Sequence, residues 1–175
     1  MNRFFRPNLT SCRLASSDCR LLKKQLADLE LHTRLDRLKN YIQHGDTSCY
    51  MHSLAVAYVS FFIARRLHLH CHITSLLIGA LLHDYFLYDW HERNQSVRWH
   101  GFRHPGIALK NANRDWQLDK LESDIIKHHM FPLTPVPPTH TESVIVCIAD
   151  KLCSTYEVFY KGVYGRLKRE LHIKT

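Results

Sequence analysis

Histidines and aspartates in apolar segments are the residues of this chain whose types and spacing could do chemistry. The chain has 14 histidines, and His52 has apolar neighbours on both flanks. His83 and Asp84 are adjacent in the most apolar stretch of the chain, and Asp150 follows a run of six apolar residues. A carboxylate in such a setting is costly to bury unless it is paired or bound to a cation.

Each of these four residues has an ordinary structural explanation when taken alone. A backbone carbonyl can satisfy one buried histidine, and an arginine or the amides of a helix N-terminus can satisfy one aspartate. Four residues would need four such partners, whereas one divalent metal ion satisfies all of them. Imidazole and carboxylate ligands from different helices are a common way to build a metal site in an all-α core. The pattern therefore predicts a metal site.

The segments that must position these side chains read as helices. Apolar residues recur at steps of three or four, and capping residues precede several segments. The predicted helices cover residues 21–44, about 49–69 after a cap at 46–48, 76–90, 106–113, 119–130 and 141–160, before a basic final turn. Residues 93–105 and the proline-rich stretch 132–138 are predicted connections. No segment alternates with period two for long, so we predict an all-α bundle of about six to seven helices.

Length and composition indicate one globular domain. At 175 residues and 20.7 kDa the chain has room for a single core. Hydrophobic residues make up 45% and charged residues 23%, which excludes disorder for the bulk of the chain. We predict a domain over residues 21–175, with 1–20 as a basic N-terminal segment that is either flexible or packed against the body.

The net charge of +8 lies at the two ends of the chain. Residues 1–24 hold six basic residues against one acidic residue, and residues 161–175 hold five against one. The remainder, 25–160, has 13 basic and 14 acidic residues. A nucleic-acid domain should carry its basic residues on a folded face, so this distribution argues against nucleic acid as the main partner.

Cysteine spacing and hydropathy favour a soluble, cytoplasmic protein with reduced thiols. The six cysteines contain no C-x-x-C pair, and residues 1–20 lack the apolar core of a secretory signal. The longest apolar stretch, 54–64, is far shorter than the ~20 residues of a membrane span. The amphipathic first helix could pair with a second copy to form a homodimer.

The order of His52, then His83 with Asp84, then Asp150 resembles the HD-domain superfamily of metal-dependent phosphohydrolases. The resemblance covers about 48–160 and includes the contexts Leu-Leu-His-Asp at 81–84 and Ile-Ala-Asp-Lys at 148–151. His104 and His129 fall between these motifs, as in HD proteins that hold two metals. The Gly-Tyr-Pro motif of the HD-GYP group is missing, so the chain looks closer to small single-domain bacterial HD hydrolases than to that group.

The resemblance implies a dinuclear centre in which the carboxylate of Asp84 bridges two divalent ions. Iron or manganese would suit this centre best, with nickel, cobalt or zinc as alternatives, whereas magnesium prefers a site with more oxygen ligands. His128 is an alternative to His129, because neighbours on a helix point about 100° apart. The implied ligands are His52, His83, Asp84, His104, His129 and Asp150.

The implied reaction is hydrolysis of a phosphate ester or anhydride of a nucleotide or small phosphorylated metabolite by a metal-activated water. Two alternatives remain: a di-iron oxygenase with the same ligand pattern, and a non-catalytic, metal-stabilised module that senses a nucleotide or binds a partner. A reaction that survives replacement of iron by manganese would separate hydrolysis from oxygenation.

Further side chains near the ligands are candidates for catalysis or substrate binding. Asp89 and His91 are candidate proton donors, Lys151 a candidate phosphate contact, and Arg103 and Asn111 further substrate contacts. Glu157 lies seven residues after Asp150 on the same helix face and is a candidate hydrogen-bond partner of a ligating histidine. Residues expected to be exposed are His68, His70, His72, His100 and His140; those expected in the core are Tyr156, Phe159 and Tyr160.

Overall fold

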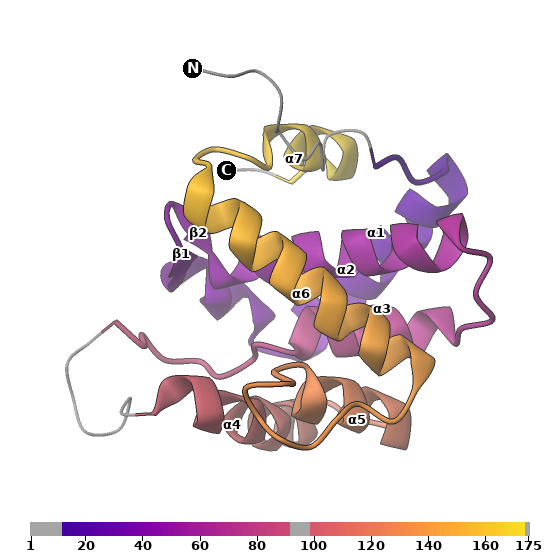
Figure 1. Ribbon diagram of the computed structural model, residues 1–175. Coiled ribbons are helices and arrows are strands. Elements are labelled where there is room, and N and C mark those ends of the chain that lie inside the picture. Colours follow the sequence, from indigo (N-terminus) through magenta and orange to yellow (C-terminus); the bar gives the residue numbers. More distant parts are fainter. Residues whose placement is uncertain (1–11, 92–98, 174–175) are drawn as a thin grey trace.

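The computed structural model describes residues 12–91 and 99–173, and they form an all-α bundle with one very short hairpin (Figure 1). This confirms the predicted fold class. The elements are α1 (Ser16–His32), η2 (Leu35–Asn40), β1 (Ile42–His44), β2 (Thr47–Ser48), α2 (Cys49–Arg66), α3 (Ile73–Leu82), α4 (His100–Asp115), α5 (Lys120–His128), α6 (Thr141–Phe159) and α7 (Gly165–Leu171).

Helix α2 is the centre of the bundle. It is apolar around nearly its whole circumference, which is typical of a helix that is covered on all sides. Helices α3 and α6 pack against it, and α5 packs against both α3 and α6. In Figure 1, α6 crosses the front of the bundle, α4 and α5 lie below it, and α7 lies above it. The metal-site candidates therefore come from helices that meet in one core.

Two predicted helix caps are present. The Ser48 hydroxyl accepts the backbone N–H of Met51 at the start of α2. Asp119 and Glu122 form a reciprocal capping box at the start of α5, in which each carboxylate accepts the other residue's backbone N–H. These caps fix where two of the helices around the site begin.

The prediction of one helix over 21–44 is wrong beyond His32. The chain turns extended at Thr33, whose hydroxyl donates to the Leu29 carbonyl and accepts the N–H of Leu35. The apolar spacing continues through η2 only because its leucines enter the same core. The β1–β2 hairpin follows, and it carries residues 43 and 44 toward the core.

The predicted helix over 76–90 is also too long, and it begins too late. Helix α3 spans Ile73–Leu82, and the chain then leaves the helix in a turn in which Phe86 N–H donates to the Asp84 carbonyl. Leu87 has a φ of +60°. Tyr85 and Phe86 are fully buried, so the apolar run continues without helical backbone. His83 and Asp84 thus lie just past the end of α3 rather than inside it.

The predicted loop over 93–105 is wrong from residue 100 onward, where α4 begins; residues 92–98 lie outside the described part of the chain. Pro105 lies near the start of this helix and does not end it. His100, expected to be exposed, is half-buried on α4. Phe159, expected in the core, is 74% exposed, whereas Tyr156 is buried.

The remaining elements agree closely with the predictions made from the sequence. The proline-rich stretch 132–138 is not helical, and α6 ends one residue before its predicted end. All six cysteines are free.

The apolar face of α1 is buried in the chain's own core, so it is not available to a second copy. Across residues 12–91 and 99–173, no helix combines the length and the apolar character that crossing a bilayer requires.

Candidate metal centre

The six candidate ligands come from α2, α4 and α6 and from the residues just past the ends of α3 and α5, and they converge on the Asp84 carboxylate. On its Oδ2 side lie the Nε2 atoms of His83 at 3.4 Å and His52 at 3.7 Å. Asp150 closes this group, with its Oδ1 3.1 Å from His52 Nε2 and 3.7 Å from His83 Nε2. We call these four residues the first subsite.

A second group of nitrogen atoms faces the other oxygen of Asp84. His104 Nε2, from α4, lies 3.1 Å from Asp84 Oδ1, and His129 Nε2, at the end of α5, lies 3.5 Å from it. We call Asp84, His104 and His129 the second subsite. One carboxylate thus stands between two sets of imidazoles, with one oxygen toward each.

Backbone and carboxylate acceptors hold every one of the four rings with its Nε2 inward. The Nδ1–H groups of His83, His104 and His129 donate to carbonyls three or four residues earlier, at 2.7, 3.0 and 2.8 Å. His52 Nδ1 donates to Glu157, as predicted, at 2.9 Å from Oε1. A backbone carbonyl can only accept, so His83, His104 and His129 carry a proton on Nδ1, and Nε2 is the nitrogen that each ring turns toward the centre.

Several buried atoms of the centre lack a partner in the described part of the chain. His83 Nε2 and Asp84 Oδ1 make no hydrogen bond. His104 Nε2 and His129 Nε2 lie only 2.9 Å apart, and with both Nδ1 atoms protonated their lone pairs face each other. A cation between such atoms removes the repulsion and satisfies the orphaned acceptors. The residues therefore fit divalent metal binding.

The two subsites differ in their protonation. Burial opposes charge on His83, but Asp84 and Asp150 outweigh it and raise the pKa of His83 to about 9. Burial acts the other way on Asp150, yet His52 and His83 hold its pKa well below the usual range. At His129 burial prevails and lowers the pKa to about 4. A metal ion entering the first subsite must therefore displace a proton, whereas the His129 imidazole is already neutral at pH 7.

A cavity of about 670 Å³ opens onto this centre, a size typical of a small-molecule site. Asp84, Asp150, His104 and His129 are among the residues that line it. Its remaining lining residues are Gln43, His44, Trp90, His100, Gly101, Met130, Pro132, Leu133, Lys151 and Ser154. The buried ligands are thus reachable from solvent through a wall that is largely apolar and aromatic.

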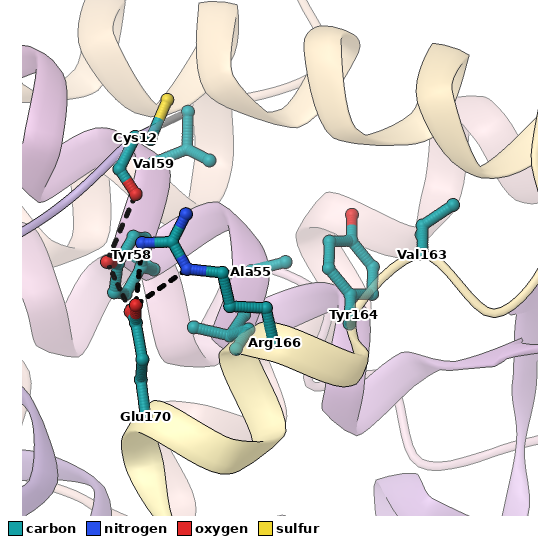
Figure 2. Close-up of a pocket in the computed structure, with 9 residues that line it drawn as sticks. Cys12, Ala55, Tyr58, Val59, Val163, Tyr164, Arg166 and Glu170 are labelled. Carbon is teal, nitrogen blue, oxygen red and sulfur yellow. Dashed lines mark hydrogen bonds and ion pairs between the residues drawn. The ribbon is translucent and has the colours of Figure 1, made fainter. Parts of the chain in front are cut away.

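Figure 2 shows a different cavity, between α2, α7 and the chain near Cys12. Its volume of about 30 Å³ is enough for one water molecule. Its polar groups are already engaged, because Arg166 and Tyr58 both donate to the Glu170 carboxylate. This cavity offers no site for a substrate.

The profile of the HD domain family matches residues 49–155, well over half of the chain, and this range contains all six converging residues. The chain belongs to the HD domain family. HD domains are metal-dependent phosphohydrolases as a group, and their divalent metals are held by His and Asp side chains like those gathered here. No curated protein and no solved structure matches this chain.

The HD domain's two adjacent histidines at 128 and 129 point to different places. The His129 ring faces the centre, whereas His128 Nδ1 lies 2.8 Å from Asp124 Oδ1 on the same helix. The sequence analysis favours His129 as the ligand, and it is the His129 ring that the turn at the end of α5 directs to the centre.

The other predicted site residues are not all near the centre. Lys151 lines the cavity, where its ammonium donates to the His129 carbonyl and to Asp150. Asn111 instead donates its amide to the carbonyls of Tyr85 and Phe86, which ties α4 to the turn after Asp84.

Asp89, His91 and Arg103 lie outside the cavity lining. Asp89 accepts the backbone N–H of His91 in an exposed turn. Arg103 is exposed on α4. The structure thus brings Lys151 to the six converging residues but not these three.

Sequence reasoning missed several residues at the site. Gln43 donates to Asp84 Oδ2 at 2.7 Å, and Cys49 donates to Gln43 in turn. The His100 ring stacks on that of His104 at 4.6 Å, and Trp90 stacks on His100 at 5.0 Å. Gln43 lies on the hairpin, Trp90 in the segment after α3 and His100 at the start of α4, and all three segments were misassigned from the sequence. Cys49 begins the correctly predicted α2, but nothing in the sequence indicated its contact with Gln43.

Proposed function

We propose that this HD domain protein hydrolyses a phosphate ester or anhydride bond in a nucleotide or small phosphorylated metabolite. The observation that carries the proposal is the position of the Asp84 carboxylate, which lies between two pairs of imidazole rings and lines an open cavity. When bound there, a pair of divalent ions would supply an activated water and neutralise charge on the phosphoryl group. Four imidazoles and two carboxylates favour iron or manganese, with nickel, cobalt or zinc as alternatives.

The chain's own residues would hold and orient the reacting groups. Gln43 fixes the Asp84 carboxylate by its hydrogen bond, and Glu157 fixes the His52 ring. Lys151 is the proposed contact for a substrate phosphate, because its ammonium lies beside Asp150 at the cavity wall. The apolar lining of Trp90 and Leu133 would exclude water around the uncharged part of the substrate.

Asp89 and His91 do not enter this proposal as proton donors, and Arg103 and Asn111 do not enter it as substrate contacts. The first two form a turn outside the cavity lining, and the Asn111 amide is occupied by two backbone carbonyls. Lys151 is therefore the single residue of the predicted substrate-binding set that the proposal retains.

The test is phosphate release from a panel of nucleoside mono-, di- and triphosphates and sugar phosphates. The protein is purified without chelator, analysed for metals, and assayed after reconstitution with iron or with manganese. We expect release from at least one substrate with either metal, and its loss in Asp84→Asn. Metal-loaded protein that releases no phosphate from the panel would contradict the proposal.

The same experiment separates the alternatives. Oxygen consumption with iron alone, and no turnover with manganese, would indicate the oxygenase. Bound metal without any turnover, together with saturable nucleotide binding, would indicate the sensing module.

A further inference from the structure

The outer face of α6 carries an apolar stripe. Figure 1 shows this helix crossing the front of the bundle with its outer side uncovered by the other labelled elements. Exposed residues recur along it at steps of three or four. We call them the α6 stripe: Val144, Ile148, Leu152, Thr155 and Phe159. The four apolar members are 41%, 50%, 50% and 74% exposed.

No charged residue interrupts the α6 stripe. The acidic residues of α6, Glu142, Asp150 and Glu157, are buried on its inner side. Its one basic residue, Lys151, donates to a backbone carbonyl and to Asp150. The solvent-facing side of a helix in a globular protein is ordinarily polar or charged, so a continuous uncharged apolar row marks a contact surface.

We infer that a second copy of this chain covers the α6 stripe, with the two α6 helices packed antiparallel about a two-fold axis at Leu152. In that register the two Leu152 side chains meet, and, offset by one residue from exact opposition, Val144 lies against the partner's Phe159 and Ile148 against the partner's Thr155. Small side chains then lie opposite large ones, which is the condition for close packing. The stripe is therefore complementary to itself, as an isologous interface requires.

Charge is consistent with this arrangement. The α6 stripe brings no charge into the contact, and antiparallel helices oppose their dipoles favourably. Helix α7, which carries part of the basic excess, follows the C-terminal end of α6. Antiparallel pairing places the two α7 helices at opposite ends of the dimer, so the basic flanks stay apart.

The size of the stripe indicates a weak but specific dimer. Side chains of these types present roughly 100 to 200 Å² each when fully accessible, so the exposed fractions amount to about 400 Å² of apolar surface per copy. When Thr155 and the neighbouring Thr141 are included, two copies would bury about 1,000 Å² in total, which is at the lower end of the range for specific interfaces. A dissociation constant in the micromolar range is expected.

The test is sedimentation equilibrium of the full chain from about 1 to 200 μM, with Leu152→Glu as the variant. We expect the wild type to pass from monomer to dimer and Leu152→Glu to remain monomeric, since two glutamates would meet on the axis. Leu31→Glu is the matched control, because Leu31 is 78% exposed on α1. It should dimerise like the wild type. Circular dichroism and Tm report whether each variant is folded.

A charge-swap experiment tests the axis itself. Leu152→Lys alone should be monomeric, and its mixture with Leu152→Glu should form a 1:1 heterodimer. A wild type that stays monomeric throughout would overturn the inference. A dimer that survives Leu152→Glu, or a mixture that fails to associate, would overturn it as well.

Discussion

At the scale of residues, the candidate centre depends on ring orientation as much as on residue type. All four imidazoles are anchored through Nδ1, three by carbonyls of their own turn and one by Glu157. A carbonyl three or four residues earlier is a local partner, so the orientation of the His83, His104 and His129 rings depends only on the local helical turn. Only His52 depends on a residue far along the chain.

Replacing His83 should remove metal from the protein. His83 Nε2 faces both carboxylates of the first subsite, 3.4 Å from Asp84 and 3.7 Å from Asp150, so we expect His83→Ala to lose most of its metal by elemental analysis. His128→Ala is the control and should retain it, because His128 pairs with Asp124 instead. Equal metal content in the two variants would contradict the assignment.

Metal affinity should rise with pH. The pKa of His83 is raised to about 9, so below that pH a proton occupies the ring and competes with the ion. We expect the apparent affinity of the apoprotein to increase from pH 6 to 9, with proton release during titration in a weakly buffered solution. Binding that is independent of pH across this range would be evidence against His83 as a ligand.

Glu157 should act through His52. The fully buried Glu157 carboxylate also accepts the Tyr164 hydroxyl, so Glu157→Gln keeps the shape and removes the negative charge behind His52. We expect metal affinity to fall about 10- to 100-fold, the usual effect of losing such a partner. A large loss of Tm with unchanged affinity would show a structural role only.

At the scale of elements, short irregular segments deliver residues that the helices cannot. The β1–β2 hairpin brings Gln43 to Asp84, and its tip lies against the end of α6. Gly45 at this tip has a φ of +58°, and an added Cβ would lie 2.9 Å from the Glu157 carbonyl oxygen. The hairpin and α6 can meet only because this residue has no side chain.

Gly45→Ala should therefore destabilise the protein more than Gly162→Ala. Both glycines have a positive φ, but a Cβ at Gly162 meets nothing within 4 Å. We expect Gly45→Ala to cost about 1 to 3 kcal/mol more in the free energy of unfolding, measured in urea. If the two variants lost equal amounts of unfolding free energy, the close approach of Gly45 to the Glu157 carbonyl would not contribute to stability.

The capping box of α5 predicts a pH effect. Burial raises the pKa of Glu122 to about 7, so the folded state holds this proton more tightly than the unfolded state. Its contribution to stability is present below the unfolded pKa and is lost as pH rises to about 7. Glu122→Gln should thus gain roughly 1 to 2 kcal/mol in unfolding free energy relative to wild type between pH 5 and pH 8, which is less than the full shift in pKa implies because solvent screens part of the effect. A constant difference would refute this.

At the scale of the whole molecule, three helices and the ends of two more meet at one buried polar cluster that the apolar core surrounds. Metal binding to the native state alone should couple to global stability by mass action. We expect a chelator to lower the Tm of the wild type and added manganese to restore it. Calorimetry measures both changes. In His83→Ala, Tm should respond to neither.

The sequence by itself determined the fold class, the family and the types of the converging side chains. Helical periodicity is local, and apolar runs around histidine and aspartate mark burial wherever they occur. The caps at Ser48 and Asp119 are equally local, since each involves residues three apart. The ends of α1 and α3 were not predictable, because leucines and aromatic residues past the last helical turn enter the same core and continue the apolar pattern.

Only the tertiary structure decided which residues share the site. Contacts such as Gln43 with Asp84 and His52 with Glu157 join positions that are 41 and 105 residues apart. It also brought the N-terminal and C-terminal segments together, since Arg13, Arg20 and Lys23 line one cavity with Glu170 and His172. Such proximity depends on how helices pack, and packing is set by the whole core rather than by any local pattern.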